Sequence, residues 1–153
     1  MKKRVAIAGA TGFIGKWFID KYKNEFDIIA LSRNKLRYPE KSNIHWKQVD
    51  LYSISSTTKA LENVDIGIYL VHSMQPSTRM NQGSFEDTDI LLADNFSRAA
   101  QDCKLEQIIY VGGILPKDEY TMSKHLRSRY EVEKTLGSGL TPLTSIRAGI
   151  IIG

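Results

Sequence analysis

A short glycine-rich stretch carries the clearest chemistry in this sequence. Its residues are Gly9, Ala10, Thr11, Gly12, Phe13, Ile14 and Gly15. The first glycine permits a tight turn, the second lets the backbone approach a diphosphate, and the third lets a helix pack close to the preceding strand. A helix that begins here presents unpaired N–H groups and the positive end of its dipole to the phosphates. The stretch therefore predicts a nucleotide-binding loop.

A second candidate group follows the next apolar run. Residues 27–31 are predicted to form a strand, which ends in Ser32, Arg33, Asn34 and Lys35. An NAD site places an Asp or Glu at this point to bind the ribose hydroxyls. A 2′-phosphate instead needs cationic, preferably forked donors, which Arg33 supplies. Ser32, Arg33 and Lys35 are therefore predicted to favour NADP over NAD, and a solvated loop is the alternative interpretation.

Further candidates stand at the ends of later strands, because ligands of open α/β sheets bind beyond the carboxyl ends of the strands. Asp50 either binds the adenine amino group or forms a turn before a short helix near residues 56–61. His72 is either a neighbour of the cofactor or a histidine that packs a loop. The candidate contacts at these strand ends are Asp50, Leu51, Val71, His72 and Gly112.

Strands and helices alternate along the whole chain. Apolar runs predict strands over residues 4–8, 27–31, 44–49, 64–71, 107–111 and 143–147. Helical spacing of apolar residues predicts helices from the glycine loop to residue 22, over 87–103, and from 123 or 124 to about 137. The alternation predicts a doubly wound parallel sheet, a Rossmann fold, and residues 1–153 are expected to form one NAD(P)-binding domain.

The composition limits the classes of partner. The 153 residues carry a net charge of +4, but the basic residues are scattered and form no run of the kind that binds nucleic acid. The single cysteine, Cys103, excludes an internal disulfide. The apolar segment after Arg4 is too short for a signal peptide, and no later run is long enough to span a membrane. We expect a cytoplasmic protein that binds a small-molecule substrate, with no metal, and its oligomeric state is left open.

Four motifs together carry a resemblance to a known superfamily. They are the glycine stretch at 9–15, Asp50-Leu51, and the segments 69–74 and 125–129, and Arg147 adds a single matching residue. These motifs resemble the extended and atypical, NmrA-like branches of the short-chain dehydrogenase/reductase superfamily. In that superfamily the glycine stretch and the Asp-Leu pair bind the cofactor. The resemblance covers essentially the whole chain and implies an NAD(P)H-binding Rossmann protein.

The usual catalytic residues of the superfamily are not in their expected places. Members use Ser or Thr with Tyr and Lys, and the hydroxyl residue should follow the strand at 107–111. Gly112 and Gly113 stand there instead. Tyr130 and Lys134 have the spacing Tyr-x-x-x-Lys, but 100° per helical residue points them away from the apolar stripe that should face the sheet. We therefore interpret this pair as a decoy.

A different register places His125 and Arg129 at the catalytic positions. The superfamily has a Glu four residues after its Lys, and counting back from Glu133 puts Arg129 at the Lys position and His125 at the Tyr position. His can transfer protons near neutral pH, whereas Arg cannot act as a base but can hold ribose or phosphate oxygens. The structural alternative for both is a polar helix face bonded to neighbouring loops.

Two functions remain open at this point. The first is an NADP(H)-dependent oxidoreductase, related to epimerases, that acts on a small carbonyl or sugar-like substrate. The second is a non-catalytic dinucleotide-binding module with a sensing or scaffolding role. Extended members of the superfamily carry a C-terminal substrate domain, and the chain stops at Gly153 just after the last predicted strand. That domain is therefore expected to be absent or truncated, and a partner subunit could supply the missing wall of the substrate cleft.

Overall fold

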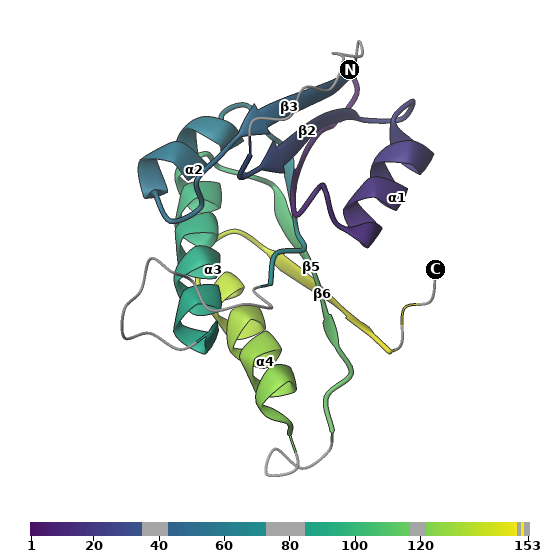
Figure 1. Cartoon of the computed structure of the whole chain (residues 1–153). Coiled ribbons are helices and arrows are strands. Elements are labelled where there is room, and N and C mark those ends of the chain that lie inside the picture. Colours follow the sequence, from purple (N-terminus) through teal and green to yellow (C-terminus); the bar gives the residue numbers. More distant parts are fainter. Residues whose placement is uncertain (35–42, 73–84, 117–121, 150, 152–153) are drawn as a thin grey trace.

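A six-stranded parallel sheet organises the molecule. The computed structural model describes residues 1–34, 43–72, 85–116, 122–149 and 151 (Figure 1). The strands are β1 (Arg4–Ala8), β2 (Asp27–Ser32), β3 (Ile44–Gln48), β4 (Ile66–Tyr69), β5 (Gln107–Gly113) and β6 (Leu143–Ala148). The helices are α1 (Phe13–Tyr22), α2 (Ile54–Leu61), α3 (Phe85–Asp102) and α4 (Lys124–Leu136). The predicted Rossmann-like α/β fold is confirmed.

The order of the strands places a crevice at the centre of the sheet. The order is β3-β2-β1-β4-β5-β6, so β1 pairs with β2 on one side and with β4 on the other. The chain therefore runs from β1 outward through β2 to β3 and then crosses back to β4 on the other side of β1. In open parallel sheets such a switch in strand order opens a crevice beyond the carboxyl ends of the strands, where ligands bind. The loop after β1 and the end of β4 meet at this crevice.

The helices cover the two faces of the sheet unequally. In Figure 1, α1 lies on one face, while α2, α3 and α4 lie on the other. The larger core fills the α2–α4 side and centres on Tyr69 and Phe96, whose ring centroids are 5.1 Å apart. The smaller core under α1 joins Ile19 to apolar side chains of β1 and β2, such as Ile7 and Ile28. Burial of these side chains holds the helices against both faces of the sheet.

Two differences between the predicted and the observed elements lie in β4 and β5. The strand predicted over 64–71 is shorter, because Val64 closes a turn through its N–H bond to Leu61 O and Val71 leaves the sheet. Gly112 and Gly113 do not follow the fifth strand but are its last two residues, paired with Arg147 and Ala148.

Helix α1 packs on the sheet through one face. Its buried residues are Gly15 and Ile19, whereas Trp17 remains 52% exposed. Trp17 packs edge to face on Tyr22 instead, with the Lys21 ammonium 4.7 Å from its ring centroid. Within the described part of the chain, no helix is long and apolar enough to cross a bilayer.

Candidate functional site

The loop after β1 has a turn that only glycine fits well. Gly9 has a φ of +92°, a backbone conformation that side chains rarely allow. A Cβ at this position would lie 3.0 Å from the Leu70 Cβ and 3.1 Å from the Leu70 carbonyl carbon. The Gly12 N–H donates to Gly9 O at 3.0 Å and closes the turn. Gly9 therefore brings the loop against the segment that leaves β4.

The start of α1 lies close against the same loop. A Cβ at Gly15 would lie 2.5 Å from Gly9 O and 2.7 Å from Ala10 Cα, so a side chain would force helix and loop apart. A Cβ at Gly12 would meet only Gly9 O, at 3.3 Å. Gly15 is thus required for packing, while Gly12 is exposed and leaves space in front of the helix.

The N-terminus of α1 is arranged to receive an anion. Gly12 is its N-cap and provides no side-chain hydrogen bond, and the first turn contains no acidic residue. The Lys16 N–H makes the first bond of the helix, to Gly12 O at 3.0 Å, so the N–H groups before it lack intrahelical acceptors. These donors and the helix dipole favour a phosphate group at this point. The residues present therefore fit the diphosphate of a dinucleotide.

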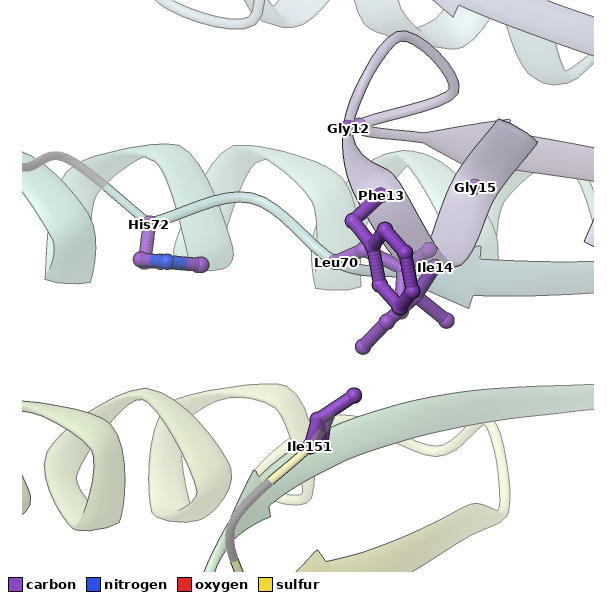
Figure 2. A pocket seen from close by; sticks show the side chains of 8 residues that line it. Gly12, Phe13, Ile14, Gly15, Leu70, His72 and Ile151 are labelled. Atoms are coloured by element: carbon purple, nitrogen blue, oxygen red, sulfur yellow. The ribbon is translucent and has the colours of Figure 1, made fainter. Parts of the chain in front are cut away.

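A cavity of about 480 Å³ opens on this loop. Its volume lies within the range of small-molecule sites. Figure 2 shows Phe13, Ile14 and Leu70 grouped at one end, His72 set apart from them, and Ile151 across the cavity. The lining residues are Gly9, Gly12, Phe13, Ile14, Gly15, Leu70, His72 and Ile151.

The cavity gathers six of the candidates named from the sequence and two residues that the sequence did not indicate. Leu70 and Ile151 were missed because neither belongs to a polar motif. The position of Leu70 directly after β4 could have suggested it, since its N–H donates to Ala8 O at 2.9 Å beside the glycine loop. Thr11 is exposed on the loop and does not line the cavity.

The end of β2 holds Arg33 by its backbone. Ser32 Oγ accepts from the Asn34 N–H at 3.2 Å, and Gln48 Nε2 donates to Arg33 O at 3.2 Å. Arg33 itself is exposed and directly follows the carboxyl end of β2. Lys35 lies outside the described residues. Gln48 was not singled out from the sequence, since only its pairing opposite Ser32 brings it to this backbone.

Asp50 and Leu51 have structural roles after β3. Asp50 Oδ1 accepts from the Tyr52 N–H at 3.2 Å, which is the turn that the sequence left as one alternative. The N-cap of α2 is Ser53, whose side chain accepts from the Ser56 N–H. Leu51 is buried, and Val71 packs against the same core. Contact of these residues with a cofactor stays a prediction.

His72 lines the cavity and is close enough to α4 for the charge of Arg129 to act on it. Burial lowers its pKa below the ordinary value, and the nearby positive charge of Arg129 lowers it further. The Leu70 backbone and Asp89 act in the opposite direction, but the net effect favours the neutral imidazole. His72 is therefore a neutral group at the β4 side of the crevice.

The helical register predicted for α4 agrees with the burial of its apolar residues. Val132 and Leu136 are buried, as the stripe required, while His125 is exposed. Lys134 pairs with Glu131 at 3.0 Å, and its Nζ lies 5.1 Å from the Tyr130 ring centroid. Whether His125 and Arg129 take the catalytic positions stays a prediction.

A hydrogen bond between His125 and Arg129 fixes the state of the imidazole. The Arg129 Nε–H donates to His125 Nε2 at 3.1 Å. An accepting Nε2 carries no proton, so His125 is neutral with its proton on Nδ1. The two residues thus form a unit one turn apart on α4.

The environment of Gly112 explains why no hydroxyl side chain stands there. A Cβ at this position would lie 2.9 Å from Cε1 of the Tyr110 ring. Tyr110 is held in place because its hydroxyl donates to Arg129 O at 3.1 Å. Burial raises the pKa of Tyr110 to about 12, although Arg129 acts to lower it. Tyr110 is therefore a neutral hydrogen-bond donor that links β5 to α4.

An ion pair ties α4 to the last strand. Arg147 Nη2 lies 2.7 Å from Glu133 Oε1, and its Nε lies 3.3 Å from Oε2. Burial raises the pKa of Glu133, but its hydrogen bonds and ion pair with Arg147 act in the opposite direction, and the net pKa lies below its usual value. Glu133 and Arg147 thus hold the helix that carries His125 and Arg129 against the sheet.

The family of the chain follows from comparison with known proteins. Residues 5–142 match the model of the NAD dependent epimerase/dehydratase family. The chain belongs to this family. The predicted resemblance to the extended branch of the short-chain dehydrogenase/reductase superfamily is confirmed at this level, and the narrower NmrA-like placement stays a prediction. The family description and the glycine loop agree on a nicotinamide dinucleotide as the class of cofactor.

One curated relative is the auxiliary protein GraX of Staphylococcus aureus (strain NCTC 8325 / PS 47). It is 30% identical over 118 residues, which make up 74% of this chain and 37% of GraX. The chain therefore spans well under half the length of this relative.

Solved structures show the same fold. The UDP-N-acetylglucosamine 4-epimerase from Bacillus cereus has a TM-score of 0.72 at 20% identity, over 95% of this chain and 53% of that one. The Bordetella bronchiseptica enzyme WbmG, in complex with NAD and UDP, has a TM-score of 0.78 at 13% identity, over 96% and 53%. The oxidoreductase ylbE from Lactococcus lactis has a TM-score of 0.76 at 18% identity, over 94% and 68%. This chain spans about half the length of the first two structures.

Proposed function

We propose that this domain binds NADP(H) with its diphosphate on the glycine loop. The observation that carries the proposal is the cavity at the N-terminus of α1, a helix with neither a capping side chain nor an acid in its first turn. The adenosine half then extends over β2 toward Arg33, and the nicotinamide half extends over β4 toward His72. A single dinucleotide-binding domain and a cytoplasmic location are parts of the same proposal.

The preference for NADP over NAD rests on Arg33. Its backbone is anchored by Gln48, its side chain is exposed, and no acid stands among Ser32, Arg33 and Asn34 to bind the ribose hydroxyls. A guanidinium suits a 2′-phosphate, because it presents forked donors and keeps its charge.

Calorimetry with both dinucleotides tests this preference. We expect Arg33→Ala to weaken NADP binding by about tenfold, the loss of one charge-assisted contact, and to leave NAD binding unchanged. Arg98→Ala is the matched control, because Arg98 is an exposed arginine of α3 that pairs with Asp94. Equal affinity for NAD and NADP in the unchanged protein, or an unchanged NADP affinity in Arg33→Ala, would refute the assignment.

The first candidate activity is an oxidoreductase on a small carbonyl or sugar-like substrate. When bound, the nicotinamide supplies the hydride, and the protein must provide a proton to the carbonyl oxygen and hold the substrate. We assign these two tasks to His125 and Arg129, which lie one turn apart on α4. For His125 to donate from Nε2, this nitrogen must first gain a proton and lose the hydrogen bond from Arg129.

The second candidate is a dinucleotide-binding module without turnover. Two observations favour it: Gly112 offers no hydroxyl to orient a substrate, and His125 Nε2 is already engaged by Arg129. The relative GraX is described as an auxiliary protein rather than by a reaction, which supports the same interpretation.

One assay separates the two candidates. NADPH oxidation is followed against a panel of aldehydes, ketones and keto sugars, with dinucleotide binding measured on the same samples. Turnover that His125→Ala abolishes and Tyr130→Phe retains would support the oxidoreductase. Binding of NADPH without turnover on any substrate would support the module. A large loss in Tyr130→Phe would contradict the register that makes Tyr130 and Lys134 a decoy.

A further inference from the structure

An arginine that has no acidic partner among the described residues lies beside the proposed nicotinamide end of the site. Arg129 comes from α4, and its charge acts on His72, which lines the cavity at the end of β4. The following inference rests on the proposed dinucleotide site, because that site defines which part of the cavity remains for a substrate.

Arg129 differs from several other cations of the chain. Arg4 pairs with Asp27, Arg98 with Asp94, and Arg147 with Glu133. Among the residues that the structure describes, Arg129 makes no ion pair, and its one side-chain hydrogen bond goes from Nε to neutral His125. Its two Nη groups therefore retain the forked set of donors that matches a carboxylate or a phosphate.

The acids that face this region do not offset Arg129. Glu133, one turn further along α4, accepts hydrogen bonds from Nε and Nη2 of Arg147. Asp89 is buried in α3 and has interactions of its own. The half-buried guanidinium is thus placed where a ligand, rather than a side chain of the described chain, would supply the negative charge.

The neighbours of Arg129 suit an anion as well. His125 is neutral and keeps its proton on Nδ1, so it can donate a hydrogen bond. His72 lines the cavity, and the charge of Arg129 acts on it. An anion in this place would approach one fixed cation and two imidazoles contributed by different elements.

We propose that the substrate of this site carries a carboxylate or phosphate group, which the Nη groups of Arg129 bind beside His72 and His125. The anionic group is held at α4, and the rest of the substrate extends into the cavity toward the nicotinamide. Arg129 acts here as a substrate-binding residue. Under this assignment it does not hold the cofactor.

Three histidines give the experiment its readout. The chain contains His45, His72 and His125, and NMR resolves their imidazole signals separately. His45 serves as the internal reference, because it lies in the first half of β3 and its Nε2 is 3.0 Å from Asp27 Oδ1, away from the cavity. Dinucleotide affinity is first measured by calorimetry. The protein saturated with NADP is then titrated with glucuronate, glucose 6-phosphate, inorganic phosphate and, as the neutral probe, glucose.

The proposal predicts a saturable shift of the His72 and His125 signals with the anionic probes and none with glucose, while His45 stays unchanged. Arg129→Gln should weaken anion binding by about tenfold and leave NADP affinity within about twofold, as expected for one lost charged contact. Arg127→Gln is the matched control, since Arg127 is exposed two residues away on the same helix and points to another side. The carboxylate and phosphate probes show which of the two groups binds more tightly.

Four outcomes would overturn the proposal. They are absence of a saturable shift in the unchanged protein, equal binding of glucose, retained anion binding in Arg129→Gln, and a loss of NADP affinity in that variant, which would assign Arg129 to the cofactor. Failure of NADP to bind would instead refute the proposed function. In that case the anion titration is repeated on the protein without NADP and followed by the same three signals. Failure of NADP binding and failure of anion binding are thus measured separately.

Discussion

Gly12 and Gly15 belong to one motif, yet the structure predicts different consequences for replacing each of them with alanine. A methyl group at Gly15 would lie 2.5 Å from Gly9 O, 2.7 Å from Ala10 Cα and 2.9 Å from Ala10 C. All three are backbone atoms of the loop, so no flexible side chain can move aside. A methyl group at Gly12 would meet one atom, Gly9 O, at 3.3 Å, and the φ of Gly12 is an ordinary −75°.

The magnitudes follow from these contacts. Overpacking of a rigid site costs about 1–3 kcal/mol, and Gly15→Ala should approach about 3 kcal/mol because the contacts are backbone. The gain in helix propensity offsets about 1 kcal/mol. We therefore expect a net loss of about 2 kcal/mol of unfolding free energy for Gly15→Ala, or roughly 4–8 °C in Tm for a domain of this size. For Gly12→Ala, lower entropy of the unfolded chain and a poorer N-cap nearly cancel, which leaves a change within about 1 kcal/mol.

Binding should separate the two variants in the opposite way. The Gly12 methyl would project into the space in front of α1, where the diphosphate is proposed to lie, so Gly12→Ala should lose at least about tenfold in NADP affinity while it stays folded. Gly15→Ala should lose both stability and affinity, since its loop must move. Urea unfolding followed by circular dichroism gives the stabilities, and calorimetry gives the affinities. A Gly15→Ala protein with unchanged stability, or a Gly12→Ala protein with unchanged affinity, would refute the geometry described for the loop.

Two further predictions concern the contacts that hold α4. Because the folded-state pKa of Glu133 is lowered, its pairing with Arg147 contributes stability above the unfolded pKa and loses it as pH falls through the folded pKa. Glu133→Gln should therefore lower the urea midpoint at neutral pH, and the difference should close in acid; a difference independent of pH would contradict the ion pair. Tyr110→Phe should cost about 1 kcal/mol through the lost hydrogen bond to Arg129 O. Because its folded-state pKa is raised from 10.0 to about 12, Tyr110 contributes stability below pH 10 that is lost between pH 10 and 12. Alkaline unfolding curves should show this loss in the unchanged protein and not in Tyr110→Phe.

The fold was largely predictable because each strand is an apolar run bounded by turns. Burial on both faces of a parallel sheet makes such runs conspicuous, and the alternation with helices then determines the class of fold. The limits of β4 were not predictable in the same way. Val64 and Val71 are apolar like the strand between them, but hydropathy does not show which N–H groups join the ladder. Gly112 and Gly113 were misplaced for a related reason, since glycine indicates a turn although both residues pair with β6.

The candidate site was predictable where backbone geometry depends on a residue type. The glycine loop is such a case, because positive φ at Gly9 and the close approach at Gly15 both exclude side chains. Leu70 and Gln48 were not predictable as site residues, since neither side chain carries a charged or catalytic group and each reaches the site only through strand pairing.

Because of the hydrogen bond between His125 and Arg129, the charge of the substrate should determine whether His125 can donate a proton. In the structure, Arg129 Nε–H occupies the nitrogen that a proton donor would need, so His125 cannot act from Nε2 in this arrangement. An anion bound by Arg129 adds negative charge beside His125, and such a charge favours the protonated imidazole. A catalytic role for His125 therefore depends on a ligand that draws Arg129 away and stabilises the imidazolium. If NADPH oxidation occurs, it should favour carbonyl compounds with a carboxylate or phosphate over neutral analogues, and Arg129→Gln should remove that preference. Turnover that is equal for charged and neutral substrates would show that His125 is activated in some other way.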